Sequence, residues 1–352
     1  MRTITAAQKQ SLEDLSAEGL LRGLPVQTAE KDIHITELLR GLSGLQVHHG
    51  HFSDLDTRRG EHTRHDRGIQ FIFAGGTCLS KAYGLVNRMS EDIDIKVVLT
   101  ATEKPLKKGR SDRMRLKALH ERIPGLLEDL GFPLLVYPDS ADNPRITDKH
   151  RYYVVGAGYQ TAYENFPSLR PELKLELIQR PPLLPIERRE FGYLYESLAG
   201  LKPGAPLAID CISIAETAAE KVLSLLRRCA YQWDGYQAKG DMDPALFRHV
   251  YDVACIAERA GGSLAAARDI FPKLVSNDRD EFKGQNPQFD ADPVSVLRRT
   301  LATAGSNGLL SAQYTKHLTP LVYDMAPPTF KQAFDVFAQV ADNFLAACQV
   351  SE

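Results

Sequence analysis

Cysteine, tryptophan and long hydrophobic runs are all scarce in this sequence of 352 residues. The five cysteines show no C-x-x-C pair and no regular spacing: Cys78, Cys211, Cys229, Cys255 and Cys348. This pattern offers no disulfide framework, and the odd count predicts free thiols in a reducing compartment. Residues 1–15 lack the apolar core of a signal peptide, and no run of about 18 apolar residues could span a membrane. We therefore expect a cytoplasmic protein that does not enter a membrane.

An excess of either charge is also absent. The sequence has 43 basic and 45 acidic residues, for a formal net charge of -2. Proteins that coat nucleic acid without selectivity are usually strongly basic, so this class is excluded, whereas local contact with RNA is not. The densest positive run is interrupted by a single acid and contains Lys104, Lys107, Lys108, Arg110, Arg113, Arg115 and Lys117. Two interpretations stay open, a solvated helix face and a patch for RNA phosphates.

The sequence contains no internal repeat and no long low-complexity tract, and its 43% hydrophobic residues can bury a substantial core. Residues 30–42 and 78–86 have helical patterns, and residues 69–73, 91–99, 151–160 and 172–178 have strand patterns. From Ser213 onward the pattern is mostly helical. We therefore predict the α/β (α+β) class, with a mixed sheet flanked by helices in residues 1–205 and a helical domain in 206–352. The Pro- and Gly-bearing residues 201–206 would join them.

Five histidines gather in the polar stretch of residues 48–67: His48, His49, His51, His62 and His65. No cysteine and no tight H-x₃-H spacing accompanies them, so we interpret this stretch as a solvated loop. A zinc site is the alternative. The role of the stretch stays open.

The pattern Asp92-Ile-Asp94-Ile95 carries the first chemical signal. Side chains alternate along a strand, so both aspartates point to one face while the isoleucines point into the core. Two adjacent carboxylates repel each other unless a cation lies between them, and Mg²⁺ prefers such hard oxygen ligands together with substrate phosphates. The structural alternative is that the two acids cap a turn or face water.

Two further features complement the aspartates. A strand followed by Gly75-Gly76-Thr77 and a helix can present backbone N–H groups and a hydroxyl to a phosphate. In residues 171–178 the leucines alternate with Lys174 and Glu176. If this strand neighbours the one carrying the aspartates, Glu176 becomes the third metal ligand. Two ions would then promote in-line displacement of pyrophosphate.

Four ordered motifs resemble the AbiEii/AbiGii toxin group of nucleotidyltransferases. They are Glu30-Lys-Asp32 with the following helix, G-G-T-x-L-S-K-x-Y-G-L with R-x-S-E-D-I-D in residues 75–94, an E-x₃-E-K-x₃-L helix in residues 214–228, and Arg248-His-Val-Tyr-Asp252. Cys78 and His249 depart from the group's pattern, yet every expected metal ligand is present. The resemblance implies a core similar to that of DNA polymerase β.

Site roles also follow from the resemblance. It implies a catalytic set of Asp92, Asp94, Glu176, Lys221 and Asp252, of which the first three bind two Mg²⁺ ions, with Mn²⁺ as a substitute. It implies that an NTP contacts Gly75, Gly76, Thr77, Ser80, Lys81 and Lys221. For Lys221 the alternative is a solvated surface charge. Glu220 and Arg248 are explained equally well by an ion pair between helices.

The function expected from the resemblance is transfer of an NMP from an NTP to the 3′ end of tRNA, by the toxin of a type IV toxin–antitoxin system with a cognate antitoxin. A second hypothesis keeps the chemistry and uses a protein or small-molecule acceptor. A third is a nucleotide-binding regulator without turnover, ranked last because all three carboxylates are present. The sequence does not define the NTP, the number of nucleotides added or the oligomeric state.

Overall fold

The computed structural model describes residues 1–49, 65–66, 68–100, 110–135, 145–164, 169–170, 172–236, 244–324 and 326–349. Most of the histidine-rich stretch lies outside these ranges, so the solvated-loop and zinc interpretations are not addressed by the structure. The same holds for Lys104, Lys107 and Lys108 of the basic run. Two short strands at the ends of the histidine-rich stretch, β1 (His48–His49) and β2 (His65–Asp66), pair antiparallel.

The chain folds into two compact units. Unit 1 comprises residues 1–82, 90–182 and 186–211, and unit 2 comprises residues 83–89, 183–185 and 212–352. Each unit therefore takes residues from separated parts of the sequence. The predicted division after residue 205 stays a prediction, because a compact unit is not thereby an independently folding domain.

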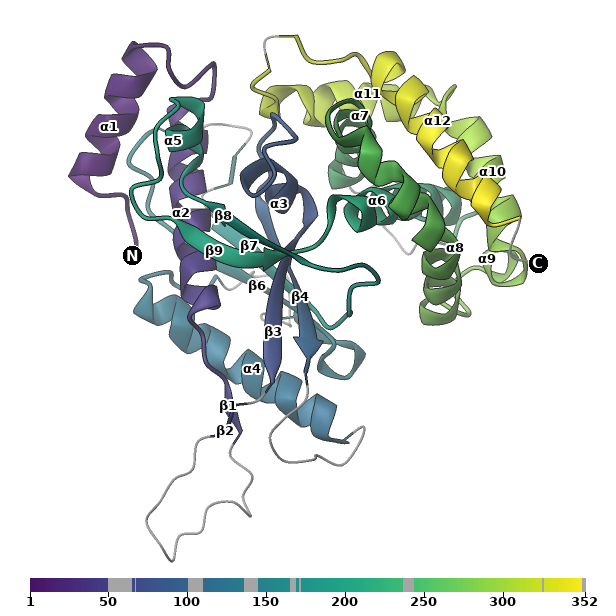
Figure 1. The fold of residues 1–352 in the computed structure, drawn as a ribbon, viewed down its shortest axis with the longest axis horizontal. Coiled ribbons are helices and arrows are strands. Elements are labelled where there is room, and N and C mark those ends of the chain that lie inside the picture. The colour runs from purple at the N-terminus through teal and green to yellow at the C-terminus, as the bar shows by residue number, and fades with distance from the viewer. Residues whose placement is uncertain are drawn as a thin grey trace, which may run out of the picture. The chain divides into compact units, whose positions relative to one another are not determined.

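Unit 1 contains a seven-stranded mixed sheet (Figure 1) with the strand order β5-β6-β7-β4-β3-β9-β8. The strands are β3 (Ile69–Ala74), β4 (Asp92–Leu99), β5 (Arg145–Thr147), β6 (Tyr152–Gly158), β7 (Glu172–Ile178), β8 (Glu187–Phe191) and β9 (Leu207–Cys211). Pairs β4–β7 and β3–β9 are parallel, and the other neighbouring pairs are antiparallel. The sheet is therefore mixed, as the sequence predicts.

One face of the sheet belongs to the core of unit 1. Ile93 and Ile95 of β4, Leu175 of β7 and Tyr153 of β6 are at most 1% exposed. The ring of His120, on helix α4 (Arg110–Asp129), stacks on the ring of Tyr153 with centroids 4.4 Å apart, so α4 packs on this face. Helix α2 (Val26–Ser43) contacts α4 and is buried along most of its length. The opposite face carries the alternate, polar residues of β4 and β7.

The remaining helices of unit 1 are short. They are α1 (Ala6–Ala17), α3 (Gly75–Lys81), α5 (Leu194–Leu198) and the 3₁₀ turn η1 (Asp148–His150). Helix α3 ends at Lys81, five residues before the predicted end, and the chain then enters unit 2. Gly84, at φ +62°, lies in the backbone region that suits glycine, which explains why the helical pattern of residues 78–86 is not followed.

Unit 2 is helical. Its helices are α6 (Ile214–Trp233), α7 (Arg248–Ala260), α8 (Leu264–Glu281), α9 (Pro287–Ala291), α10 (Pro293–Ala304), α11 (Gly308–His317) and α12 (Phe330–Ala347), with 3₁₀ turns η2 (Pro244–Phe247), η3 (Gly261–Ser263) and η4 (Thr319–Leu321). Ser213 caps α6 by accepting a hydrogen bond from the backbone N–H of Glu216. The Glu216 carboxylate accepts from the N–H groups of Leu183 and Leu184, which attaches residues 183–185 to this unit.

The predicted fold class is confirmed, since a mixed α/β part with helices is followed by a mostly helical part. Within the described ranges, no helix combines the length and the apolar character needed to cross a membrane. All five cysteines are free thiols, as predicted.

Candidate nucleotide and metal site

The three predicted metal carboxylates lie on two neighbouring strands of unit 1. In the parallel pair β4–β7, Asp94 is the register partner of Glu176 and Asp92 is the partner of Lys174. Register partners on parallel strands project from the same face, so all four side chains share the polar face of the sheet. All three acids are half-buried. The sequence could not establish this adjacency, because strand order is set by the whole fold.

The Glu176 carboxylate is engaged on both oxygens. Its Oε1 forms an ion pair with the Lys174 ammonium, and its Oε2 accepts a hydrogen bond of 3.2 Å from the Tyr152 hydroxyl. Burial alone would lower the pKa of Lys174, but the carboxylates of Asp92 and Glu176 outweigh it and raise that pKa. Among the residues with described positions, no group of three His, Cys, Asp or Glu side chains converges as a ready metal site. The Lys174 ammonium pairs with Glu176 and lies near Asp92, so it supplies positive charge among the acids.

The backbone at Gly75 is adapted to the Asp94 carboxylate. Gly75 has φ +73°, and a Cβ at this position would overlap the carboxylate of Asp94. Only glycine tolerates both the conformation and the close approach. Asp92, Asp94 and Glu176 present hard oxygen donors on adjacent strands, the type of ligand that Mg²⁺ prefers, although they do not form a ready three-ligand site within the described residues.

The residues of helix α3 make internal contacts. The Thr77 hydroxyl donates to the backbone carbonyl of Asp92, which ties the turn to the aspartate strand. The Lys81 ammonium lies 2.5 Å from Oδ1 of Asp32, and both side chains are 3% exposed. Burial lowers the pKa of Lys81, and the Asp32 carboxylate offsets only part of this change. Ser80 is buried. In this structure Thr77 and Lys81 support the turn from within unit 1.

Buried partners also explain the Glu30-Lys31-Asp32 motif of helix α2. Glu30 accepts from the backbone N–H of Ala162 at 2.7 Å, and Lys31 pairs with Glu91 at 2.8 Å. Asp32 contacts Lys81 and accepts from the N–H of Leu194. Because Glu91 precedes Asp92, this motif anchors the start of the aspartate strand. The motif was visible in the sequence, but its partners were not.

In unit 2, Asp252 of α7 is neutralised by two cations. The guanidinium of Arg88 donates to both carboxylate oxygens at 2.7 and 2.6 Å, and the Lys221 ammonium of α6 lies 2.8 Å from Oδ2. The three side chains are 0–8% exposed. Burial raises the pKa of Asp252, but the two cations outweigh it and hold that pKa below its ordinary range. Lys221 is therefore not a solvated surface charge.

Arg88 is a buried partner of Asp252 that sequence reasoning missed. It stands in the R-x-S-E-D-I-D motif, four residues before Asp92, and that position was its only sequence signal. Its 2% exposure requires a compensating charge, which Asp252 supplies from a position far along the chain.

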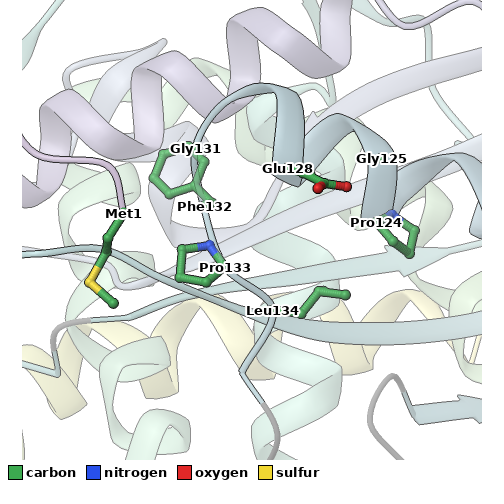
Figure 2. A pocket seen from close by; sticks show the side chains of 8 residues that line it. All are labelled: Met1, Pro124, Gly125, Glu128, Gly131, Phe132, Pro133 and Leu134. Atoms are coloured by element: carbon green, nitrogen blue, oxygen red, sulfur yellow. The ribbon is translucent and has the colours of Figure 1, made fainter.

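Two pockets lie away from these residues. A pocket of about 450 Å³ in unit 1 (Figure 2) is lined mainly by apolar groups around Phe132 and Leu134, with Glu128 as the charged side chain on its wall. A pocket of about 1000 Å³ in unit 2 is lined by Arg279, Arg298 and Arg299, among others. None of the predicted site residues contributes to either lining.

The solved structures that are similar to this chain include these two. The first is MenT4, described as nucleotidyltransferase toxin Rv2826c from Mycobacterium tuberculosis, with 19% identity, a TM-score of 0.49, and coverage of 95% of this chain and 98% of that one. The second is JHP933 from Helicobacter pylori, with 15% identity, a TM-score of 0.27, and coverage of 80% and 85%. No curated protein matches the sequence.

A family model matches most of the chain. The model described as "Nucleotidyl transferase AbiEii toxin, Type IV TA system" matches residues 62–336. This range contains the glycine turn, the three acids on β4 and β7, and the Arg88–Asp252–Lys221 cluster. With most of its length matched, the chain belongs to the AbiEii family of nucleotidyl transferase toxins of type IV toxin–antitoxin systems.

Proposed function

We propose that this nucleotidyltransferase moves an NMP from an NTP to the 3′ end of tRNA in the cytoplasm, in a reaction that depends on Mg²⁺. The observation that carries the metal assignment is the register of β4 and β7, which sets Asp94 beside Glu176 and Asp92 beside Lys174. A cognate antitoxin follows from the family. By the same proposal, the toxin blocks aminoacylation by modifying tRNA.

The three acids would hold the divalent ions, with Mn²⁺ as a substitute for Mg²⁺. Bound there, the ions would supply activation of the acceptor hydroxyl and neutralisation of the departing pyrophosphate. The protein's own contribution is to fix the carboxylates. Gly75 gives Asp94 its space, Thr77 holds the backbone of Asp92, and Tyr152 orients Glu176.

The nucleotide positions divide into two kinds. Gly75 and Gly76 are proposed to approach the triphosphate through their backbone, while Thr77, Ser80 and Lys81 contribute by holding that turn. Lys221 is proposed to bind the triphosphate, since an ammonium neutralises the charge that develops on pyrophosphate. Asp252 and Arg88 then act as positioning residues, because Asp252 contacts Lys221 and Arg88 contacts Asp252.

The proposal is tested by labelled-nucleotide transfer. The purified protein is incubated with each α-labelled NTP in turn, with total tRNA, and with Mg²⁺, Mn²⁺ or a chelator. We expect label on tRNA from one or more NTPs, none with the chelator, and none with Asp92→Ala. Asp280→Ala removes an exposed acid and is the matched control.

The outcomes separate the remaining hypotheses. Label on an added protein or small molecule, but not on tRNA, would keep the chemistry and reject the tRNA acceptor. Transfer that persists in chelator would reject the metal assignment of Asp92, Asp94 and Glu176. Tight NTP binding with no transfer to any acceptor would favour the regulator.

A further inference from the structure

The polar face of the sheet continues beyond Glu176 to the sheet edge. In the antiparallel pair β6–β7, Val154 faces Glu176, so Tyr152 lies two positions along on the same face. In the pair β5–β6, Arg145 is the partner of Val154 and Thr147 is the partner of Tyr152. The register therefore places Arg145 on the same face as the carboxylates, at the edge strand β5.

Tyr152 interacts with charged residues on both of its sides along this face of the sheet. The Tyr152 hydroxyl donates a hydrogen bond of 3.2 Å to Glu176, whose other carboxylate oxygen pairs with Lys174. The charges of Lys174 and Arg145 both act on the phenol, so both cations lie near it. Half-buried Tyr152 thus stands between the carboxylates and an exposed arginine.

The turn after β5 exposes a second cation, Lys149, at the edge of the sheet. Asp148, Lys149 and His150 have φ of 47°, 54° and 73°, a left-handed conformation that non-glycine residues adopt only when their surroundings hold them there. His150 Nδ1 lies 3.4 Å from Nδ1 of His120. Arg151 contacts Asp148 at 3.2 Å and Gln179 at 3.1 Å.

Two cations at this edge of the sheet, Arg145 and Lys149, are available to bind a ligand. Arg151 and Asp148 neutralise each other, whereas the side chains of Arg145 and Lys149 are exposed and have no hydrogen bond or ion pair with another side chain of the described ranges. Exposed cations beside a partly exposed aromatic ring suit a single-stranded polynucleotide, whose phosphates bind the cations and whose bases stack on the ring. A small-molecule acceptor would not need a row of exposed cations leading to the carboxylates.

We propose that Arg145, Lys149 and Tyr152 bind the single-stranded 3′ end of a polynucleotide acceptor and direct it along the sheet face toward Asp94 and Glu176. This proposal rests on the proposed function and deepens it by locating the acceptor. Arg145 and Lys149 contact phosphates without reading sequence, so they set affinity and direction.

The test measures binding of a fluorescent single-stranded oligoribonucleotide by anisotropy at several salt concentrations, beside binding of an NTP. Arg145→Glu should weaken RNA binding about tenfold and reduce the salt slope by about 1. Lys149→Asn, which keeps a residue that tolerates the left-handed turn, should act in the same direction. Lys202→Glu, an exposed lysine in the loop before β9, is the control with the same charge change. NTP binding should be unchanged in all three variants.

The outcomes keep this inference separate from the proposed function. If the wild type transfers label to tRNA and Arg145→Glu binds RNA as tightly as Lys202→Glu, the proposed RNA contact of Arg145, Lys149 and Tyr152 is overturned. The proposed function is then unaffected. If Arg145→Glu but not Lys202→Glu loses RNA binding and the wild type transfers no label to RNA, the RNA contact of these three residues is supported and the tRNA acceptor is rejected. If the wild type does not bind RNA, the proposed RNA contact is overturned.

Discussion

At the scale of single residues, charge compensation in buried positions determines what each side chain can do. Asp252 has no solvent exposure and accepts hydrogen bonds from two cations. Removing one member of a buried ion cluster leaves the others desolvated and uncompensated, which costs about 3–5 kcal/mol. Asp252, which the family motif associates with the active site, therefore also stabilises unit 2.

We expect Asp252→Asn to lower the free energy of unfolding by about 3 kcal/mol, because Arg88 and Lys221 lose their counter-charge. Chemical denaturation followed by circular dichroism measures the change. The control is Lys331→Ala, which removes an exposed pair with Asp335 and should change stability by less than about 0.5 kcal/mol. Equal stability of the two variants would contradict the structural role of Asp252.

Lys174 offsets the repulsion among the acids of the polar face. Lys174→Met should lower stability by about 1 kcal/mol in chelator, since its charge is partly screened by solvent. Mg²⁺ should raise the melting temperature of this variant more than that of the wild type. Thermal melts with and without Mg²⁺ test this expectation, with Lys202→Met as the exposed-lysine control. An identical Mg²⁺ response in all three proteins would argue against a cation site at these acids.

Buried neutral histidines predict sensitivity to acid. Burial lowers the pKa of His34 from 6.5 to about 3 and that of His120 to about 4. Below pH 6.5 the unfolded chain binds protons that the folded protein excludes, so stability falls as pH decreases and is constant above that value. Each histidine contributes a loss of about 2 kcal/mol between pH 7 and pH 5.

His34→Phe tests this sign, because phenylalanine fits a ring site beside Tyr159 and Phe132 and has no titrating group. Between pH 7 and pH 5 the variant should lose about 2 kcal/mol less stability than the wild type. Urea unfolding at the two pH values gives both numbers. The same loss in both proteins would mean that His34 binds a proton in the folded state.

At the scale of elements, the turn from β3 to α3 combines two demands on Gly75, a positive φ and a close approach to Asp94. Gly84 also has a positive φ, but a Cβ there would meet nothing within 4 Å. Substitutions at the two glycines can therefore distinguish the effect of backbone strain from the effect of displacing the Asp94 carboxylate.

Gly84→Ala should cost about 1 kcal/mol of stability through strain and leave nucleotide transfer intact. Gly75→Ala should add displacement of Asp94 and reduce transfer about a hundredfold, since a catalytic group moved by about 1 Å loses that much. Transfer rates and denaturation curves of both variants test the difference. Retained transfer in Gly75→Ala would remove Asp94 from the proposed catalytic set.

The strands that position the site were readable from the sequence because their patterns are local. Leucines alternating with Lys174 and Glu176 define β7, and the alternating isoleucines define β4. The short strands β5, β8 and β9 were missed, since strands of three to five residues carry little periodic signal. As a result, the sequence predicted the acids, but it did not predict that Arg145 and Lys149 lie at the edge of the same sheet.

At the scale of the whole molecule, long-range pairing decides which residues share a site. Lys221, Arg88 and Asp252 lie far apart in sequence, and only the fold of unit 2 assembles them. Asp32 and Lys81 are brought together likewise in unit 1. Sequence reasoning identified Lys221 and Asp252 through a family motif, but it could not show that they pair with each other or that Arg88 completes the cluster.

The central claim is nucleotidyl transfer supported by the acids of β4 and β7, and the position of the transferred label tests it most directly. Wild-type protein would receive ATP, CTP, GTP or UTP labelled at either the α- or the γ-phosphate, together with tRNA and Mg²⁺. We predict that α-label joins the acceptor and that γ-label leaves as pyrophosphate. Asp94→Asn should abolish both products and Asp280→Asn should abolish neither. Incorporation of γ-label, or transfer that survives in Asp94→Asn, would contradict the account.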